Sequence, residues 1–227
     1  PKVISISQST ELGTVYSIGE LKALCDFAHA NGMYVHLDGA RLFNAAVADA
    51  QGGTVVDRVR SIVDHFDSVS VCFSKGLGAP VGSALCGSRE LIAKALRWRK
   101  VLGGGLRQSG VLAAAALHAL DHHVDRLADD HALAQRLAQG LQGISGLSVR
   151  SAQTNIVFVD VADGRGPALL EALKAQGVLA TGLIGLRFVT HLGVDAAGID
   201  HALDCIRRFM QTSAGEAAQG LSRSGVY

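Results

Sequence analysis

"YVHLDGARLFNAA", residues 34–46, runs a mostly apolar stretch into an aspartate and then, three residues later, an arginine. The alternation of apolar and polar residues before Asp38 predicts a β-strand. In open α/β sheets, ligands bind beyond the carboxyl ends of the strands. Asp38 is therefore expected at the edge of the sheet where ligands bind, and Arg41 follows it by three residues.

A second stretch, "SVSVCFSKGLGAPVGS" at residues 68–83, also ends a predicted strand in a charged residue. Gly76 and Gly78 follow Lys75, and they allow a sharp turn with little side-chain bulk around the amine. A lysine amine in this place can form a Schiff base with an aldehyde. A carboxylate on a neighbouring strand, such as Asp38, can keep a pyridine nitrogen protonated so that the ring accepts electrons. A phosphate-binding P-loop is excluded, because here the glycines follow the lysine.

The surrounding pattern alternates strands with helices, which predicts an α/β fold with a mostly parallel sheet. The expected strands are 3–7, 33–38, 67–74 and 81–86, and the expected helices are 17–32, 55–66, 88–98 and 111–140, the last broken near 129–130. From residue 147 the order changes to that of a small α+β domain. Its expected strands are 148–150, 155–161, 178–183 and 185–192, and its expected helices are 166–177 and 195–211.

Composition excludes several classes of function. The 21 Lys and Arg residues nearly balance the 20 Asp and Glu residues, and no sustained basic run is present, so nucleic acid is not an expected partner. No uncharged apolar run is long enough to cross a membrane. The four cysteines are scattered without CxxC spacing, so we expect no metal site, no disulfide framework and a reducing, cytoplasmic location. Because the chain opens on Pro1 and enters a strand at once, we expect that an upstream portion is missing.

Four blocks, "HLDGARLFNA", "SVCFSKGLGAPVGSALCG", "RWRKVLGGGLRQSG" and "LRFVTHL", resemble in the same order the motifs of the low-specificity L-threonine aldolases. These are pyridoxal-phosphate enzymes of the aspartate-aminotransferase fold type. The resemblance implies that residues 1–108 form the C-terminal part of a large cofactor-binding domain and residues 109–211 a small C-terminal α+β domain. The small, polar residues 212–227 predict a flexible tail.

The same resemblance implies pyridoxal 5'-phosphate as cofactor, and aldol cleavage of L-threonine or L-allo-threonine to glycine and an aldehyde. It also implies a homotetramer. Lys75 would hold the cofactor as a Schiff base, Asp38 would pair with its pyridine nitrogen, and Arg41 would reach its phenolic oxygen. Lys100 and Arg107 would flank the cofactor, from a neighbouring subunit. Arg187, together with Arg41, would bind the substrate carboxylate, for which the guanidinium fork is suited.

Competing interpretations of these residues remain open. Asp38 could be the N-cap of the next helix, with Arg41 in its first turn. Arg187 could extend to solvent from an edge strand. The histidines on the helical stretch, His118, His122 and His123, are expected on its solvated face.

The function also has alternatives. The chain could belong to another pyridoxal-phosphate β-eliminating lyase or transaminase of the same fold type. It could also be an inactive, truncated homologue that acts only through subunit contacts. Because an upstream portion is expected to be missing, we expect residues 1–227 alone to cleave threonine negligibly. Aldolases of this family carry their phosphate-binding loop and a ring-stacking histidine upstream of the point that matches Pro1, so the resemblance assigns no general base within this sequence.

Overall fold

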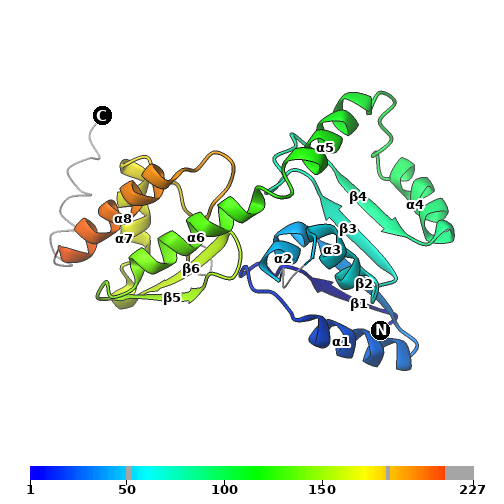
Figure 1. Cartoon of the computed structure of the whole chain (residues 1–227), viewed down its shortest axis with the longest axis horizontal. Coiled ribbons are helices and arrows are strands. Elements are labelled where there is room, and N and C mark those ends of the chain that lie inside the picture. The colour runs from blue at the N-terminus through cyan, green and yellow to red at the C-terminus, as the bar shows by residue number, and fades with distance from the viewer. Residues whose placement is uncertain (50–52, 183–184, 213–227) are drawn as a thin grey trace. The chain divides into compact units, whose positions relative to one another are not determined.

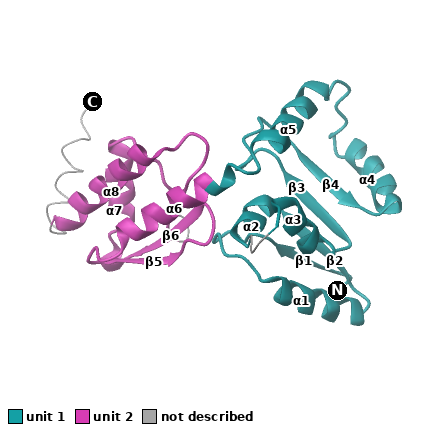
Figure 2. Cartoon of the chain, viewed as in Figure 1, with its two compact units in different colours: residues 1–128 teal, residues 129–227 magenta. Residues whose placement is uncertain are grey.

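The structure is a computed structural model that describes residues 1–49, 53–182 and 185–212. It divides into two compact units, residues 1–128 and 129–227, which are coloured separately in Figure 2. The sequence analysis expects a boundary after residue 108, twenty residues earlier. Each unit has its own sheet and its own hydrophobic core.

The first unit is built on a four-stranded sheet in the order β1-β2-β3-β4 (Figure 1). Its strands are β1 (Val3–Ser7), β2 (Tyr34–Gly39), β3 (Ser68–Cys72) and β4 (Ser83–Gly87). β1, β2 and β3 are parallel, and β4 is antiparallel to β3. The expected mostly parallel sheet is confirmed.

Three helices cover one face of this sheet: α1 (Ile18–Ala30), α2 (Leu42–Ala48) and α3 (Val55–Val63). They bury one apolar cluster against the strands, which includes Leu21 of α1, Ala45 of α2 and Leu37 of β2. α1 begins with a capping box in which Ser17 and Glu20 satisfy each other's backbone N–H groups, so its start is fixed locally. The sequence pattern does not predict α2 as a separate helix.

Alternate residues of β2 and β3 point to the other face of the sheet, and most of them are polar. His36 of β2 is paired in register with Ser68 of β3, and its Nδ1 lies 2.8 Å from the Ser68 hydroxyl. Asp38 belongs to the same row of alternate residues as His36. A strand with one apolar and one polar face is typical of a sheet that packs a core on one side only.

Two further helices, α4 (Arg89–Val101) and α5 (Gly110–His122), complete the first unit. α5 belongs to this unit because Ala119 is buried in a cluster with Leu77 and Ala79, which follow β3. This packing explains why the boundary falls after residue 128. The chain between α5 and α6 breaks at residues 123–126, before the Asp129-Asp130 position expected from the sequence.

The second unit is an α+β arrangement, as expected. Its antiparallel sheet has the order β5-β6-β7. The strands are β5 (Leu147–Ser151), β6 (Ile156–Val161) and β7 (Leu186–Val189), and the helices are α6 (Leu127–Leu141), the short 3-10 helix η1 (Ala162–Gly164), α7 (Gly166–Ala175) and α8 (Ala196–Gln211). Leucines of α6, α7 and α8 form the core with alternate residues of β6 and β7.

The expected strand at residues 178–183 is wrong over its described part. There the chain makes one isolated bridge, between Thr181 and Arg187, and residue 183 lies outside the described residues. Residues 213–227, which hold nearly all of the expected tail, also lie outside them. Among the helices described, none is both long and apolar enough to cross a membrane.

Candidate active site

The carboxyl ends of β2 and β3 lie side by side, because the two strands are parallel and hydrogen-bonded in register. Asp38 is the fifth residue of β2 and is paired with Ser70 of β3. Lys75 follows the last residue of β3, Cys72, by three positions. The fold therefore brings Asp38 and Lys75 to the same edge of the sheet, as the sequence predicts.

Asp38 is partly buried, and its side chain organises the turn that follows β2. Its Oδ1 accepts a hydrogen bond of 3.1 Å from the backbone N–H of Ala40, and its carbonyl oxygen accepts one of 3.0 Å from Gln8. Helix α2 has Arg41 as its N-cap and no side-chain cap. The interpretation of Asp38 as a helix cap is therefore wrong, and its carboxylate belongs to the sheet edge.

Arg41 lies between that edge and α2. Its side chain is only 12% exposed, and its Nη1 is 3.4 Å from Oε1 of Glu11, whose side chain is 75% exposed. This ion pair contributes little to stability, because the Glu11 carboxylate is well solvated and the contact is long for a hydrogen bond. Glu11 can be displaced from Arg41 at small cost by an anionic ligand.

The loop that carries Lys75 is closed by its own backbone hydrogen bonds. Gly78 donates to the carbonyl of Lys75 at 2.9 Å, which makes a tight turn, and Gly78 takes the positive φ of 72° that the turn ends on. Ala79 donates to Phe73 at 2.9 Å across the base of the loop. Lys75 itself is exposed, and in the described part of the chain its amine has no hydrogen-bond or ion-pair partner.

Gly76 links this loop to α2. A Cβ atom at Gly76 would lie 2.9 Å from a methyl carbon of Leu127 and 3.2 Å from Oδ1 of Asn44. Asn44 is buried in α2, three residues beyond Arg41. The Lys75 loop is therefore in close contact with the helix that Arg41 begins. The sequence analysis missed Asn44, although it lies inside the quoted "HLDGARLFNA" block.

The chain after β1 contributes to the same edge, which the sequence analysis also missed. Gln8 is fully buried, and its side chain exchanges hydrogen bonds of 2.9 and 3.1 Å with the backbone of Tyr16, closing the segment between them. Ser9 is 3% exposed, and its hydroxyl is buried without a hydrogen-bond partner. An unsatisfied buried hydroxyl is costly and marks a place where a ligand can supply the missing bond.

The other three predicted residues lie elsewhere. Lys100, in the last turn of α4, packs its side chain over Gly105, and Arg107 lies in the following loop; both are exposed. Neither makes a hydrogen bond or ion pair with Asp38, Arg41 or Lys75 among the described residues. Arg187 lies on β7 of the second unit, partly buried, where it exchanges two backbone hydrogen bonds with Thr181. Their proposed roles stay predictions.

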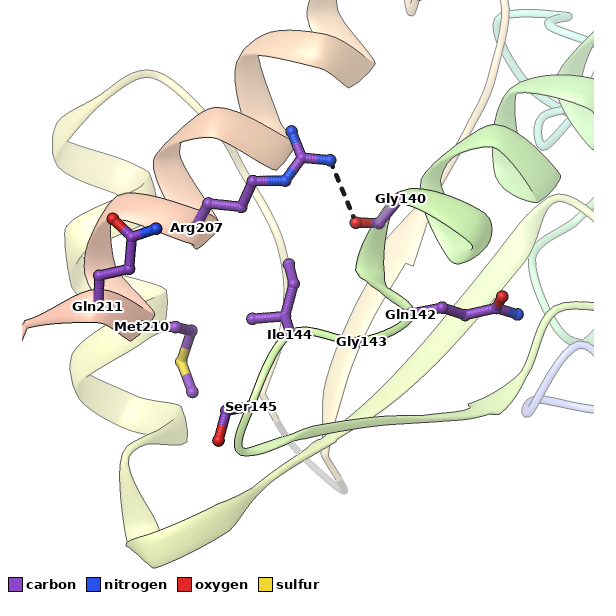
Figure 3. Close-up of a pocket in the computed structure, with 8 residues that line it drawn as sticks. All are labelled: Gly140, Gln142, Gly143, Ile144, Ser145, Arg207, Met210 and Gln211. Carbon is purple, nitrogen blue, oxygen red and sulfur yellow. Dashed lines mark hydrogen bonds between the residues drawn. The ribbon is translucent and has the colours of Figure 1, made fainter.

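A cavity of about 410 Å³ in the second unit does not coincide with any predicted residue. It lies where α6 and α8 end, and Figure 3 shows Arg207 of α8 reaching the carbonyl oxygen of Gly140, at 3.3 Å. Its lining has one hydroxyl, that of Ser145, but no carboxylate or histidine that could act as a base for it, so we do not assign catalysis to this cavity. Nowhere in residues 1–49, 53–182 and 185–212 do three or more His, Cys, Asp or Glu side chains gather as a metal site requires.

The chain is similar in sequence to known proteins. Residues 1–164 match the model of the beta-eliminating lyase family. A low-specificity L-threonine aldolase of Escherichia coli K12 is 42% identical over 193 residues, which are 85% of this chain and 56% of that protein. The chain thus spans a little over half the length of such curated relatives.

Solved structures show the same fold. A threonine aldolase of Leishmania major superposes with a TM-score of 0.75 at 21% identity, covering 92% of this chain and 61% of the other. An aspartate aminotransferase of Rhodobacter sphaeroides superposes with a TM-score of 0.70 at 19% identity, covering 92% and 56%. The two units together therefore have the fold of the pyridoxal-phosphate-dependent transferases, as the sequence predicts. Because the family model matches residues 1–164, which are most of this chain, the chain belongs to the beta-eliminating lyase family.

Proposed function

We propose that the protein that contains this chain cleaves L-threonine and L-allo-threonine to glycine and acetaldehyde, with pyridoxal 5'-phosphate as cofactor. The observation that carries the proposal is that a partly buried carboxylate near the end of β2 and an exposed lysine three residues after β3 lie at the same edge of two adjacent parallel strands. The 42% identity to the bacterial low-specificity aldolase supports this choice of substrate.

The residues at this edge fit the cofactor. Lys75 offers an amine that would hold the aldehyde covalently, and Asp38 offers a carboxylate for the pyridine nitrogen. The covered guanidinium of Arg41 suits an anionic oxygen, and the unsatisfied hydroxyl of Ser9 can form one more hydrogen bond. When bound, the cofactor supplies an electron sink for the carbon–carbon bond that breaks.

Each residue then has a defined task. Asp38 keeps a proton on the ring nitrogen, so that the ring withdraws electrons. Arg41 would bind the substrate carboxylate by paired hydrogen bonds, which would fix the orientation of the breaking bond, and the family resemblance assigns the same role to Arg187. Lys100 and Arg107 add positive charge near the cofactor from a neighbouring subunit.

A second activity is favoured by the family that the chain belongs to, since its model is that of beta-eliminating lyases. The same lysine and carboxylate can serve β-elimination or transamination, because all three reactions use the same electron sink. Product analysis distinguishes them: the aldolase releases acetaldehyde and glycine, whereas β-elimination of threonine releases ammonia and a keto acid.

The assembly and the location belong to the same proposal. We expect a homotetramer because the family resemblance implies one, with Lys100 and Arg107 near a neighbouring subunit's site. A cytoplasmic location fits the four free cysteines, of which Cys25 and Cys205 are buried. An inactive homologue that acts only through subunit contacts remains the alternative to catalysis.

The test is the replacement of Lys75 by alanine. Borohydride reduction of the protein with bound cofactor should attach the cofactor to Lys75, and the Lys75→Ala variant should lose both this adduct and acetaldehyde release while its circular dichroism is unchanged. Lys94→Ala is the matched control, because Lys94 is exposed on α4 and paired with Glu90. An adduct that peptide mass spectrometry assigns to Lys94 or Lys100 would contradict the proposal.

A further inference from the structure

Three histidine rings meet where α5 ends. The ring centroid of His118 lies 4.4 Å from that of His122 and 5.3 Å from that of His123. His118 and His122 are exposed, as the sequence predicts for this helix face, but His123 is partly buried. It is the residue that closes α5, and its side chain does not simply face solvent.

His123 forms a hydrogen bond to the loop that carries Lys75. Its Nδ1 lies 2.6 Å from the carbonyl oxygen of Leu77. A carbonyl oxygen can only accept, so the proton of this bond belongs to Nδ1 of His123. The bond therefore joins the end of α5 to a backbone atom two residues beyond Lys75.

The other described contacts of the Lys75 loop are hydrogen bonds within the loop or apolar contacts with α5. The His123 bond is therefore the polar contact that joins the loop to α5. The turn from Lys75 to Gly78 is closed by one backbone hydrogen bond within the loop. Leu77 and Ala79 are buried against Ala119 of α5, but apolar packing is not directional. A hydrogen bond fixes the orientation of a peptide group, which packing alone does not.

We infer that His123 is a positioning residue for Lys75, acting through the carbonyl of Leu77. The inference rests on the proposed role of Lys75 in holding the cofactor. The lysine side chain is long and flexible, so the position of its amine depends on how firmly its backbone is held, and small displacements of a reacting group reduce rates strongly.

Three substitutions separate the hydrogen bond from the volume of the ring. His123→Leu keeps an apolar side chain and removes the donor. His123→Asn places an amide nitrogen at the same number of bonds from the backbone as Nδ1, so it should restore the bond. His122→Leu is the matched control, because His122 is the exposed neighbour and has no bond to the loop. If His123→Leu does not fold, His123→Gln takes its place. Its amide donor lies one carbon farther from the backbone than Nδ1, so it should not restore the bond to Leu77.

The first measurement is amide hydrogen exchange in the cofactor-free chain. The Gly78 and Ala79 amides are both hydrogen-bonded inside the loop. In His123→Leu their exchange should accelerate roughly fivefold, the effect expected for loss of one neutral hydrogen bond that restrains local opening. In His123→Asn and His122→Leu it should stay within about twofold of the unaltered chain.

The second measurement uses the protein with cofactor bound. His123→Leu should lower kcat roughly tenfold with little change in KM, because the reacting amine is misplaced while substrate contacts remain. The amount of cofactor trapped on Lys75 by borohydride should fall in parallel, and His123→Asn should recover most of both.

The two proposals fail in different ways. Unchanged amide exchange together with unchanged trapping in His123→Leu would overturn the role of His123. A His123→Asn variant as impaired as His123→Leu would also overturn it, because ring volume and not the donor would then matter. Trapping on another lysine in the unaltered protein would overturn the proposed function itself, before any variant is compared.

Discussion

Asp38 and Arg41 are only three residues apart, yet the structure gives them different surroundings. Asp38 remains on the strand, where its carboxylate accepts from Ala40, and Arg41 begins a helix, where its guanidinium is largely covered. The short span between them turns the chain from the sheet into α2. The surroundings of the two side chains therefore depend on the change of backbone conformation between β2 and α2 as much as on the residue types.

The residue-scale prediction concerns the charge of Asp38. In Asp38→Asn the amide oxygen can still accept from Ala40, so the local fold should survive. The amide cannot hold a proton on a ring nitrogen, so turnover should fall roughly a hundredfold while cofactor affinity changes far less. Steady-state kinetics and cofactor titration measure the two effects. Asp26→Asn is the control, since Asp26 is exposed on α1, and near-normal turnover of Asp38→Asn would return Asp38 to a purely structural role.

At the scale of elements, helix α6 carries a histidine, His131, whose partial burial makes the stability of the fold sensitive to pH. Desolvation lowers the pKa of His131 to about 4 from its ordinary value of 6.5. The folded chain therefore prefers the neutral imidazole, and the unfolded chain binds the proton first as pH falls. Stability contributed by the neutral form is full above pH 6.5 and is lost as pH falls from 6.5 through 4.

This gives a prediction for acid unfolding. Urea titrations at pH values of about 7 and about 4.5 should show that His131→Gln loses less unfolding free energy between the two than the unaltered chain, by roughly 1 to 2 kcal/mol. His118→Gln serves as the control, because His118 is exposed on α5. Identical losses in His131→Gln and the unaltered chain would show that His131 is not buried in its neutral form.

At the scale of the whole molecule, the first unit has surfaces suited to association. Within the described residues, β1 and β4 each pair on one side only, and Trp98 and Leu102 of the α4 region are 62% and 80% exposed. Unpaired strand edges and exposed large apolar side chains favour contact with another chain. These features agree with the proposed homotetramer.

The corresponding prediction is an assembly larger than one chain. Light scattering of the purified protein that contains this chain should give a mass four times that of one subunit, stable over a concentration series. A monodisperse species of one chain mass at every concentration would contradict the proposed tetramer and the assignment of Lys100 and Arg107 to a neighbour's site.

Local patterns in the sequence determined most of the elements of this protein. Period-two alternation located β2 and β3, helical spacing located α1, and strand ends located Asp38 and Lys75, because these signals lie within a few residues of one another. The family resemblance added roles for Arg41, Lys100, Arg107 and Arg187, and none of these roles follows from spacing alone.

Only the tertiary structure decided which distant segments support the site. The contact of Gly76 with Asn44 and the bond from His123 to Leu77 join residues far apart in the chain. The unit boundary after residue 128 depends in the same way on the packing of α5 against the Lys75 loop. A sequence pattern reports preferences within a window of about a dozen residues, whereas burial and hydrogen bonding between elements depend on how the whole chain packs.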